Sequence, residues 1–293
     1  MFAIGRIAKA QAGAEPALGQ PVRTCTGDEA QTSKRVSRHT DMRVGVRRWV
    51  ARLGPAALFS LFVATWHTVS LNYPPFILPS PAAVAERFFV ELFAGRLLHH
   101  TAATLSEAIP GLAIGALAAF MLGYPIAKSA LADRLLSPFI VASQGIPFIA
   151  IAPLLLIWFG PGPAAKIFLC AIVVFFPIMV NIIAGVRSIK PLLRDLFRSL
   201  HATAWETFIK LEAPAALPLA LTGLRIGATL SMIGAIAAEF LGTDRGLGFL
   251  INQGRGMYDT TLVMVGIAAT VITALGMYTA VRALEQVLIA RRG

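Results

Sequence analysis

The sequence predicts an all-α integral membrane protein that crosses a bilayer about six times, with a cytosolic helical segment between the fourth and fifth spans. Of its 293 residues, 56% are hydrophobic and only 14% are charged, and the mean hydropathy is +0.71. A soluble domain is nearer half apolar and a quarter charged, so the surplus apolar surface requires lipid. The apolar runs are long and continuous, which favours helices over the short alternating strands of a membrane barrel.

Each predicted span is an apolar run of the roughly 20 residues that a bilayer-crossing helix needs. The spans are expected at about 50–71, 104–127, 136–159, 164–186, 217–241 and 261–281. Between the first two, residues 72–81 are rich in proline and cannot form a helix interior. Residues 82–98 have the pattern of an amphipathic helix lying at the interface, and a Gly-rich segment at 242–260 leads to the sixth span.

The first 48 residues differ from everything that follows, because they are polar, basic and without helical periodicity. We expect 1–48 to be a disordered basic cytoplasmic tail and 49–293 to be the transmembrane domain. The tail lacks the apolar core of a secretory signal peptide. Met42 is an alternative start, since the run from it resembles an ordinary passage from cytosol to membrane.

The net charge of +11 is explained by topology rather than by nucleic acid. With both termini in the cytosol, the tail and inner loops hold 20 Lys and Arg residues, the outer loops hold 5, and Arg225 lies within a span. Inner loops of membrane proteins carry such an excess. The bias survives removal of residues 1–41, so we predict cytoplasmic N- and C-termini, a lipid environment and no nucleic-acid partner.

The polar segment between the fourth and fifth spans is the most informative part of the chain. Its length of about 27 residues exceeds that of a turn. Helical spacing is visible at Leu196, Leu200, Thr203 and Thr207. Pro214 and Pro218 are expected to stop this helix where the chain re-enters the membrane. An amphipathic helix outside the bilayer must pack on something, and the residues alone leave lipid headgroups and a cytosolic partner equally open.

This segment resembles the cytoplasmic Glu-Ala-Ala loop of ABC importer permeases, the binding-protein-dependent transport inner-membrane components. The continuation PAALPLALTGLRIGATLSMIGAIAAEFLGTDRGLGFLI is similar to the nitrate, sulfonate and taurine branch. So are LPSP at 78–81, IAPLLLIWFG at 151–160 and FFPIMVNIIAGV at 175–186. The resemblance covers about 50–290 and implies a permease of an ATP-driven importer in a bacterial inner membrane.

Within the resembling loop, the motif's acidic position falls on Asp195, its two alanines on Leu196 and Phe197, and its glycine on His201. The acidic character is kept, whereas the small residues and the glycine are not. His201 cannot adopt a positive φ as cheaply as Gly. The resemblance implies that 187–214 is a coupling loop that docks in a groove of an ATPase subunit. The residues expected to carry this docking are Asp195, Leu196, Phe197, Leu200, His201, Trp205 and Pro214.

The resemblance also supplies the partners. It implies two permease copies, two cytosolic ATPase subunits and an extracytoplasmic binding protein that meets 72–100 and 242–260. The solute is then a small sulfonate, taurine, nitrate or a pyrimidine-type compound. The chain has no Gly-x-x-x-x-Gly-Lys-Ser/Thr motif, so it is expected to be a transport subunit without a cofactor, with ATP and Mg on the ATPase chain.

Three residues are candidates for the translocation path: Glu239, Arg225 and Pro147. A carboxylate within a span is costly, so Glu239 either lines the path or lies at the aqueous interface. Arg225 either snorkels toward the cytosolic headgroups or binds an anionic solute. Pro147 lies in the third span, where a proline frees a carbonyl beside a cavity.

Other polar and small residues have plainer interpretations. Glu107 is expected at the interface, His99 and His100 as a solvated pair, and Cys25 and Cys170 as free thiols, with no metal site. Glycines are expected to let the second span pack closely, at Gly111, Gly115 and Gly123.

Two other classes of protein are alternatives for a chain of this composition. A secondary transporter would show internal repeats and ionisable relays at mid-membrane, and neither is visible. A membrane-embedded enzyme would need a catalytic constellation. The structured cytosolic segment discriminates these classes, since only an ATPase-coupled permease needs it.

Overall fold

The computed structural model describes residues 54–143, 145–160, 162–241 and 243–290. The chain divides into two units, Met1–Val63 and Ala64–Gly293. In the first unit, the described residues 54–63 are helical, which agrees with the predicted first span as far as they extend. The predicted tail at 1–48, the alternative start at Met42 and the beginning of that span lie outside the described residues.

In the second unit, residues 64–70 are helical and 72–80 form turns, as the prolines predict. The helices that follow are α2 (Pro81–Phe93), α3 (Arg96–Lys128), α4 (Ala130–Ser143), α5 (Phe148–Phe159), α6 (Pro163–Arg187), α7 (Pro191–Ser199), α8 (Ala204–Thr207), the π-helical turn η1 (Phe208–Glu212), α9 (Ala213–Glu239), α10 (Leu247–Gly256) and α11 (Thr260–Ala290).

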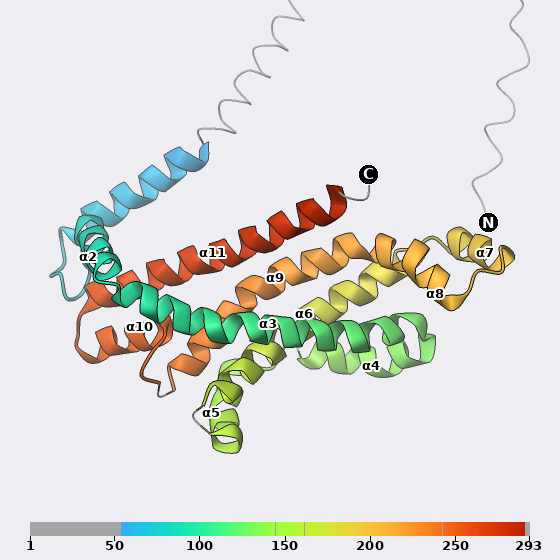
Figure 1. The fold of residues 1–293 in the computed structure, drawn as a ribbon. Helices are drawn as coiled ribbons and strands as arrows, with labels where there is room; N and C mark the ends of the chain where they lie inside the picture. Colours follow the sequence, from blue (N-terminus) through green and yellow to red (C-terminus); the bar gives the residue numbers. More distant parts are fainter. Residues whose placement is uncertain (1–53, 144, 161, 242, 291–293) are drawn as a thin grey trace, which may run out of the picture. The chain divides into compact units, whose positions relative to one another are not determined.

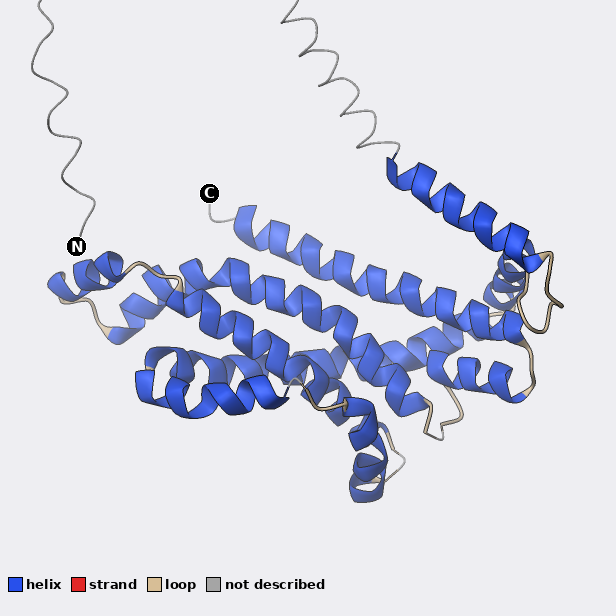
Figure 2. Cartoon of the chain, turned by 180° about the vertical axis from the view of Figure 1, so that it is seen from behind, coloured by secondary structure: helices blue, strands red, loops and turns tan. Residues whose placement is uncertain are grey.

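Helices α3, α6 and α9 lie side by side and form the core of this unit, and α11 packs on α9 and α10 (Figures 1 and 2). The short helices α2 and α10 gather at one end of these long helices, and α7 and α8 at the other (Figure 1). We call these the α10 end and the α7 end.

Glycines bring the long helices into backbone contact, as predicted for the second span. A Cβ added at Gly115 of α3 would lie 2.5 Å from the Ala171 carbonyl oxygen of α6. One added at Gly111 would lie 2.9 Å from the Ile167 carbonyl oxygen. On the other side of α6, a Cβ at Gly223 of α9 would lie 2.7 Å from the Asn181 Cβ. The three helices therefore meet along surfaces that tolerate no added atom.

Four helical segments in the described residues are long and apolar enough to cross a bilayer: Arg96–Lys128, Pro163–Arg187, Ala204–Glu239 and Thr260–Val287. They match the second, fourth, fifth and sixth predicted spans. The third was predicted as one helix, and this is wrong, because Arg134–Ser143 and Phe148–Phe159 meet at 92°. Pro147 takes an extended conformation at the N-cap of α5, and a proline cannot continue the hydrogen-bond ladder of a preceding helix. Counted as one span, the bent pair would be a fifth.

The expected helix stop at Pro214 and Pro218 is also wrong. Helix runs through both prolines, from α8 to Glu239. The π-helical turn η1 ends at Glu212, two residues before Pro214. The Ala213 N–H donates to the Phe208 carbonyl, five residues earlier. A wider turn moves the preceding carbonyls away from the proline ring, which would clash with them in a regular α-helix.

The Gly-rich segment at 242–260 contains a helix that was not predicted. Helix α10 spans ten of its residues, Leu247–Gly256. Its composition, with three glycines, disfavours a helix in isolation. The contacts that start this helix come from α3 and α9 and are described below.

Close packing of α3 on α6 predicts that Gly115→Ala destabilises the protein. The added methyl has no room, and overpacking of this kind costs about 1–3 kcal/mol. The measurement is the thermal unfolding midpoint in detergent, compared with Gly276→Ala in α11, where a Cβ would meet nothing within 4 Å. Equal midpoints for the two variants would contradict the packing described.

Candidate functional site

Helix α7 turns an apolar face to solvent. Leu192, Leu196 and Leu200 are 78%, 50% and 68% exposed. On its inner side, Arg194 and Phe197 are half-buried, and an Arg194 guanidinium nitrogen donates to the Val186 carbonyl at the end of α6 at 2.7 Å. The helix is thus held to α6 through one arginine while its leucines remain uncovered.

Helix α7 ends in a Schellman motif whose left-handed residue is His201. Its φ is +55°, the Ala202 N–H donates to the Phe197 carbonyl at 3.1 Å, and the His201 N–H donates to the Arg198 carbonyl at 3.0 Å. Glycine is the usual residue at this position, because a Cβ is strained in the left-handed region. The histidine therefore occupies the conformation that the motif's glycine would favour.

Trp205 stands on the short helix that follows. Thr203 and Glu206 form a reciprocal capping box at the start of α8. The Trp205 side chain is mostly exposed, and its ring stacks on Phe208 with centroids 5.7 Å apart. The rings of Trp205 and Phe208 form an apolar surface next to that of α7.

A buried carboxylate ties the segment of α8 and η1 to α3. Glu212, in the π turn, is 3% exposed and accepts a hydrogen bond from the Tyr124 hydroxyl at 2.5 Å. It also pairs with the Lys128 ammonium at 3.1 Å. Pro214 follows Glu212 by two residues. The π turn η1 therefore both makes room for the proline ring and carries the contacts of Glu212 with α3.

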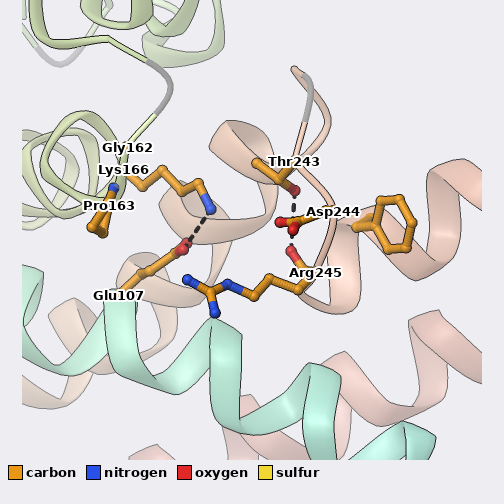
Figure 3. Close-up of a pocket in the computed structure, with 8 residues that line it drawn as sticks. Glu107, Gly162, Pro163, Lys166, Thr243, Asp244 and Arg245 are labelled. Atoms are coloured by element: carbon orange, nitrogen blue, oxygen red, sulfur yellow. Dashed lines mark hydrogen bonds and ion pairs between the residues drawn. The ribbon is translucent and has the colours of Figure 1, made fainter.

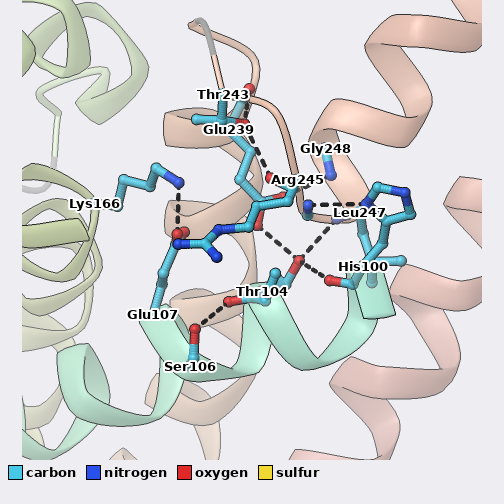
Figure 4. Close-up of polar contacts among 12 residues, drawn as sticks. His100, Thr104, Ser106, Glu107, Lys166, Glu239, Thr243, Arg245, Leu247 and Gly248 are labelled. Atoms are coloured by element: carbon cyan, nitrogen blue, oxygen red, sulfur yellow. Dashed lines mark hydrogen bonds and ion pairs between the residues drawn. The ribbon is translucent and has the colours of Figure 1, made fainter. Parts of the chain in front are cut away.

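At the α10 end, three side chains from other helices cap the start of α10 (Figure 4). The Gly246 N–H donates to His100 Nδ1 at 3.2 Å, the Leu247 N–H to Thr104 Oγ1 at 2.8 Å, and the Gly248 N–H to Glu239 Oε2 at 2.6 Å. These are donors that a helix N-terminus leaves without intrahelical partners. A carboxylate is also favoured there by the helix dipole.

Glu239 is the centre of this arrangement. It is 1% exposed, and its second oxygen accepts the Thr104 hydroxyl at 2.7 Å. Gly246 has φ +113°, and a Cβ there would collide with the Glu239 carboxylate. Backbone conformation and close approach both require glycine at 246.

A polar cavity of about 560 Å³ lies beside this cap (Figure 3). Its lining includes a buried ion pair, in which Lys166 Nζ lies 2.6 Å from Glu107 Oε1. The lining residues are Glu107, Gly162, Pro163, Lys166, Thr243, Asp244, Arg245 and Phe249.

The remaining predicted site residues are placed apart from this cavity. Glu239 belongs to the cap and is not in the cavity lining. Arg225 pairs with Glu285 of α11, with Nε 3.3 Å from Oε2. Pro147 lines a separate, apolar cavity of about 290 Å³ between α5, α6 and α9. Within the described ranges, His, Cys, Asp and Glu side chains form no group of three or more that could hold a metal ion.

The sequence of residues 111–292 matches the family of binding-protein-dependent transport system inner membrane components. The chain belongs to this family. It is a permease subunit of an ABC importer and a multi-pass protein of the inner membrane. Its role is transport rather than catalysis.

Relatives of this permease serve several kinds of solute. It is 40% identical over 242 residues to the riboflavin transport system permease protein RibX of Chloroflexus aurantiacus, covering 82% of this chain and 90% of that one. It is 31% identical to the formylaminopyrimidine transport permease protein ThiX of Halalkalibacterium halodurans, with 84% and 99% covered. It is 33% identical to the putative aliphatic sulfonates transport permease protein SsuC of Escherichia coli, with 77% and 87% covered.

The fold of this permease is shared with a solved transporter. The structure titled "Crystal structure of an amino acid ABC transporter with histidines" superimposes with a TM-score of 0.55 at 18% identity, covering 68% of this chain and 97% of that one. The likeness concerns the arrangement of helices.

Two polar residues of the permease were missed or misplaced by sequence reasoning. His100 is buried and bonded to Gly246, so the solvated-pair interpretation is wrong for it, although His99 is exposed. Thr104 was not singled out. His100, Thr104 and Glu107 follow one another in α3 at intervals of four and three residues. This spacing places the three side chains on one face of the helix. That polar stripe is the signal that could have found them.

The cap on α10 predicts that Thr104→Val destabilises the permease. Valine keeps the shape but leaves the Leu247 N–H and one Glu239 oxygen without a partner, at about 1–3 kcal/mol. The thermal unfolding midpoint in detergent should fall well below that of Thr101→Val, whose hydroxyl bonds only to the Leu97 carbonyl of its own helix. A loss no greater than that of the control would show that the cap contributes nothing.

The Schellman motif predicts that His201→Gly stabilises the end of α7. Glycine removes a left-handed strain of about 1 kcal/mol, and the free energy of local opening at the end of α7 rises by that amount. Exchange through this opening should then be about fivefold slower. Hydrogen exchange at the Ala202 amide measures this directly. The matched variant His201→Val should exchange faster than the wild type, because a β-branched residue is an outlier at positive φ. Slower exchange in the valine variant would rule out the strain.

Proposed function

We propose that the permease docks on its ATPase through the apolar surface formed by Leu192, Leu196, Leu200 and Trp205. The observation that carries this proposal is the exposure of the three leucines on α7, which Arg194 holds to α6, and of Trp205 on the neighbouring α8. Exposed apolar residues gathered on one face indicate an interaction site. Aromatic and aliphatic anchors of this kind supply most of the binding energy in protein interfaces.

The other named residues of the loop have supporting roles in this proposal. Asp195 lies on the polar side of α7, 3.4 Å from Arg198. Phe197 anchors the helix, His201 ends it, and Pro214 follows the π turn that Glu212 links to α3. A force on α7 would therefore reach α6 and α3 through these contacts.

ATP and Mg belong to a separate ATPase chain in this proposal, and this chain holds no cofactor. The absence of a P-loop motif from its sequence supports that division. Two copies of the permease would pair with two ATPase subunits. Closure of the ATPase pair would switch the path between its two openings.

The same proposal places the α7 end in the cytosol, with both termini, and the α10 end outside. The excess of Lys and Arg in the loops assigned to the cytosol supports this orientation. The segments 72–100 and 242–260 would then face an extracytoplasmic binding protein. That protein would deliver a small organic solute, of the kinds named for the relatives.

Docking is tested by Leu200→Asp, with Arg198→Glu on the opposite face of α7 as the matched charge change. Tagged permease is purified from native membranes in mild detergent, and the co-purified ATPase and its ATP hydrolysis are measured. A buried unpaired charge at position 200 should abolish association, while membrane insertion of the permease stays intact. Arg198→Glu should retain most of it. Undiminished ATPase association of the aspartate variant would refute the docking surface.

A further inference from the structure

The cavity at the α10 end contains a carboxylate oxygen without a partner. Glu107 is 4% exposed, and one of its oxygens pairs with Lys166 at 2.6 Å. The other, Oε2, is buried and has no hydrogen-bond partner in the described part of the chain. Buried acceptors of this kind are rare, and each calls for a donor. Glu107 lines the cavity, so a molecule bound there can supply that donor once the carboxylate turns Oε2 toward it.

The charges around this oxygen select the kind of donor. Glu107 is already compensated by Lys166, and the exposed charged side chains of the lining, Asp244 and Arg245, carry opposite charges. A second ammonium at Glu107 would face Lys166 as a like charge. A sulfonate or nitrate offers acceptors only and cannot bond to Oε2. A neutral N–H is the group that fits.

Arg245 and Phe249 supply the other contacts. The Arg245 side chain reaches toward Glu107 (Figure 3), and its guanidinium makes no hydrogen bond or ion pair with the residues that the structure describes. A guanidinium presents several donors in a plane, which suits a carbonyl oxygen near the N–H. Phe249 also lines the cavity, and its ring offers an apolar face for a flat molecule.

We propose that this cavity binds a planar heterocycle bearing a neutral imide or lactam group. The ring N–H donates to Glu107 Oε2, an adjacent carbonyl accepts from Arg245, and the ring lies against Phe249. A volume of about 560 Å³ is within the range of small-molecule sites. The proposal rests on the transport function proposed above and narrows its solute class. The isoalloxazine ring of riboflavin and pyrimidinediones such as uracil contain such a group, whereas alkanesulfonates do not.

The test uses the purified full chain in detergent, with uracil as the probe and saturation-transfer NMR as the readout. The matched ligand is 1,3-dimethyluracil, which keeps the ring and carbonyls but has no N–H. Uracil should receive the transfer and bind about tenfold or more tightly, the worth of a hydrogen bond to a charged acceptor. Taurine and ethanesulfonate should receive little. Equal binding of uracil and its dimethyl derivative, or preferred binding of either sulfonate, would overturn the proposal.

Protein variants locate the site. Because Glu107→Gln disturbs a buried ion pair, the lining is tested through Arg245→Ala and Phe249→Leu. Both should weaken uracil binding several-fold, whereas Arg255→Ala, an exposed arginine of α10 outside the cavity, should not. Binding that is unchanged in both lining variants would also overturn the proposal.

The ATPase measurement keeps the two proposals separate. If the wild-type permease co-purifies with an ATPase but does not bind uracil, only the cavity proposal fails. If uracil binds and no ATPase accompanies the permease, the docking proposal fails and the cavity proposal stands.

Discussion

The need to satisfy every backbone N–H and C=O away from water governs this structure. In lipid an unpaired group costs several kcal/mol, so a deviation from the helix ladder survives only where another group compensates. Besides the prolines inside helices, such as Pro110 and Pro177, three deviations in the described residues shape the fold. The π turn before Pro214 widens the ladder around the ring, the chain turns at Pro147 instead of continuing α4, and α10 begins on acceptors from α3 and α9. Each deviation lies where the permease requires something other than a straight span.

This constraint gives the two ends of the bundle different characters. At the α7 end, the links made by half-buried Arg194 and buried Glu212 hold short helices whose apolar surface remains exposed. At the α10 end, Glu239 and Thr104 are enclosed, and a short helix is fixed on them. Between the ends, glycine contacts place the backbones of α3, α6 and α9 against one another. Packed interfaces of this kind shift as units rather than deform, which is the property that the proposed action of an ATPase on α7 requires.

The sequence predicts what depends on local composition, and it fails where tertiary contacts decide. Four spans follow from hydropathy alone, because each is a continuous apolar run. Helix α10 could not be predicted, since its glycines disfavour a helix and its cap comes from residues about 140 positions away, such as Thr104 for the Leu247 N–H. The helix through Pro214 was missed because the rule that proline ends a helix assumes a regular α turn. For the site, the coupling role of 187–214 stays a prediction from resemblance, while the capping role of Glu239 needed the positions of α3 and α10.

The polar stripe of α3 shows how one helix face serves both structure and binding. His100 accepts the Gly246 N–H before α10, and Thr104 accepts the Leu247 N–H at its first residue. The Thr104 hydroxyl donates to Glu239, so these groups are satisfied within the chain. Glu107, one turn further along, faces the side chain of Lys166 instead of a helix N-terminus. A single ammonium compensates the charge of a carboxylate but not the hydrogen-bonding capacity of both its oxygens. In our proposal, the remaining capacity of Glu107 is used by a solute in the cavity, and the type of donor that the solute carries then determines which molecules bind there.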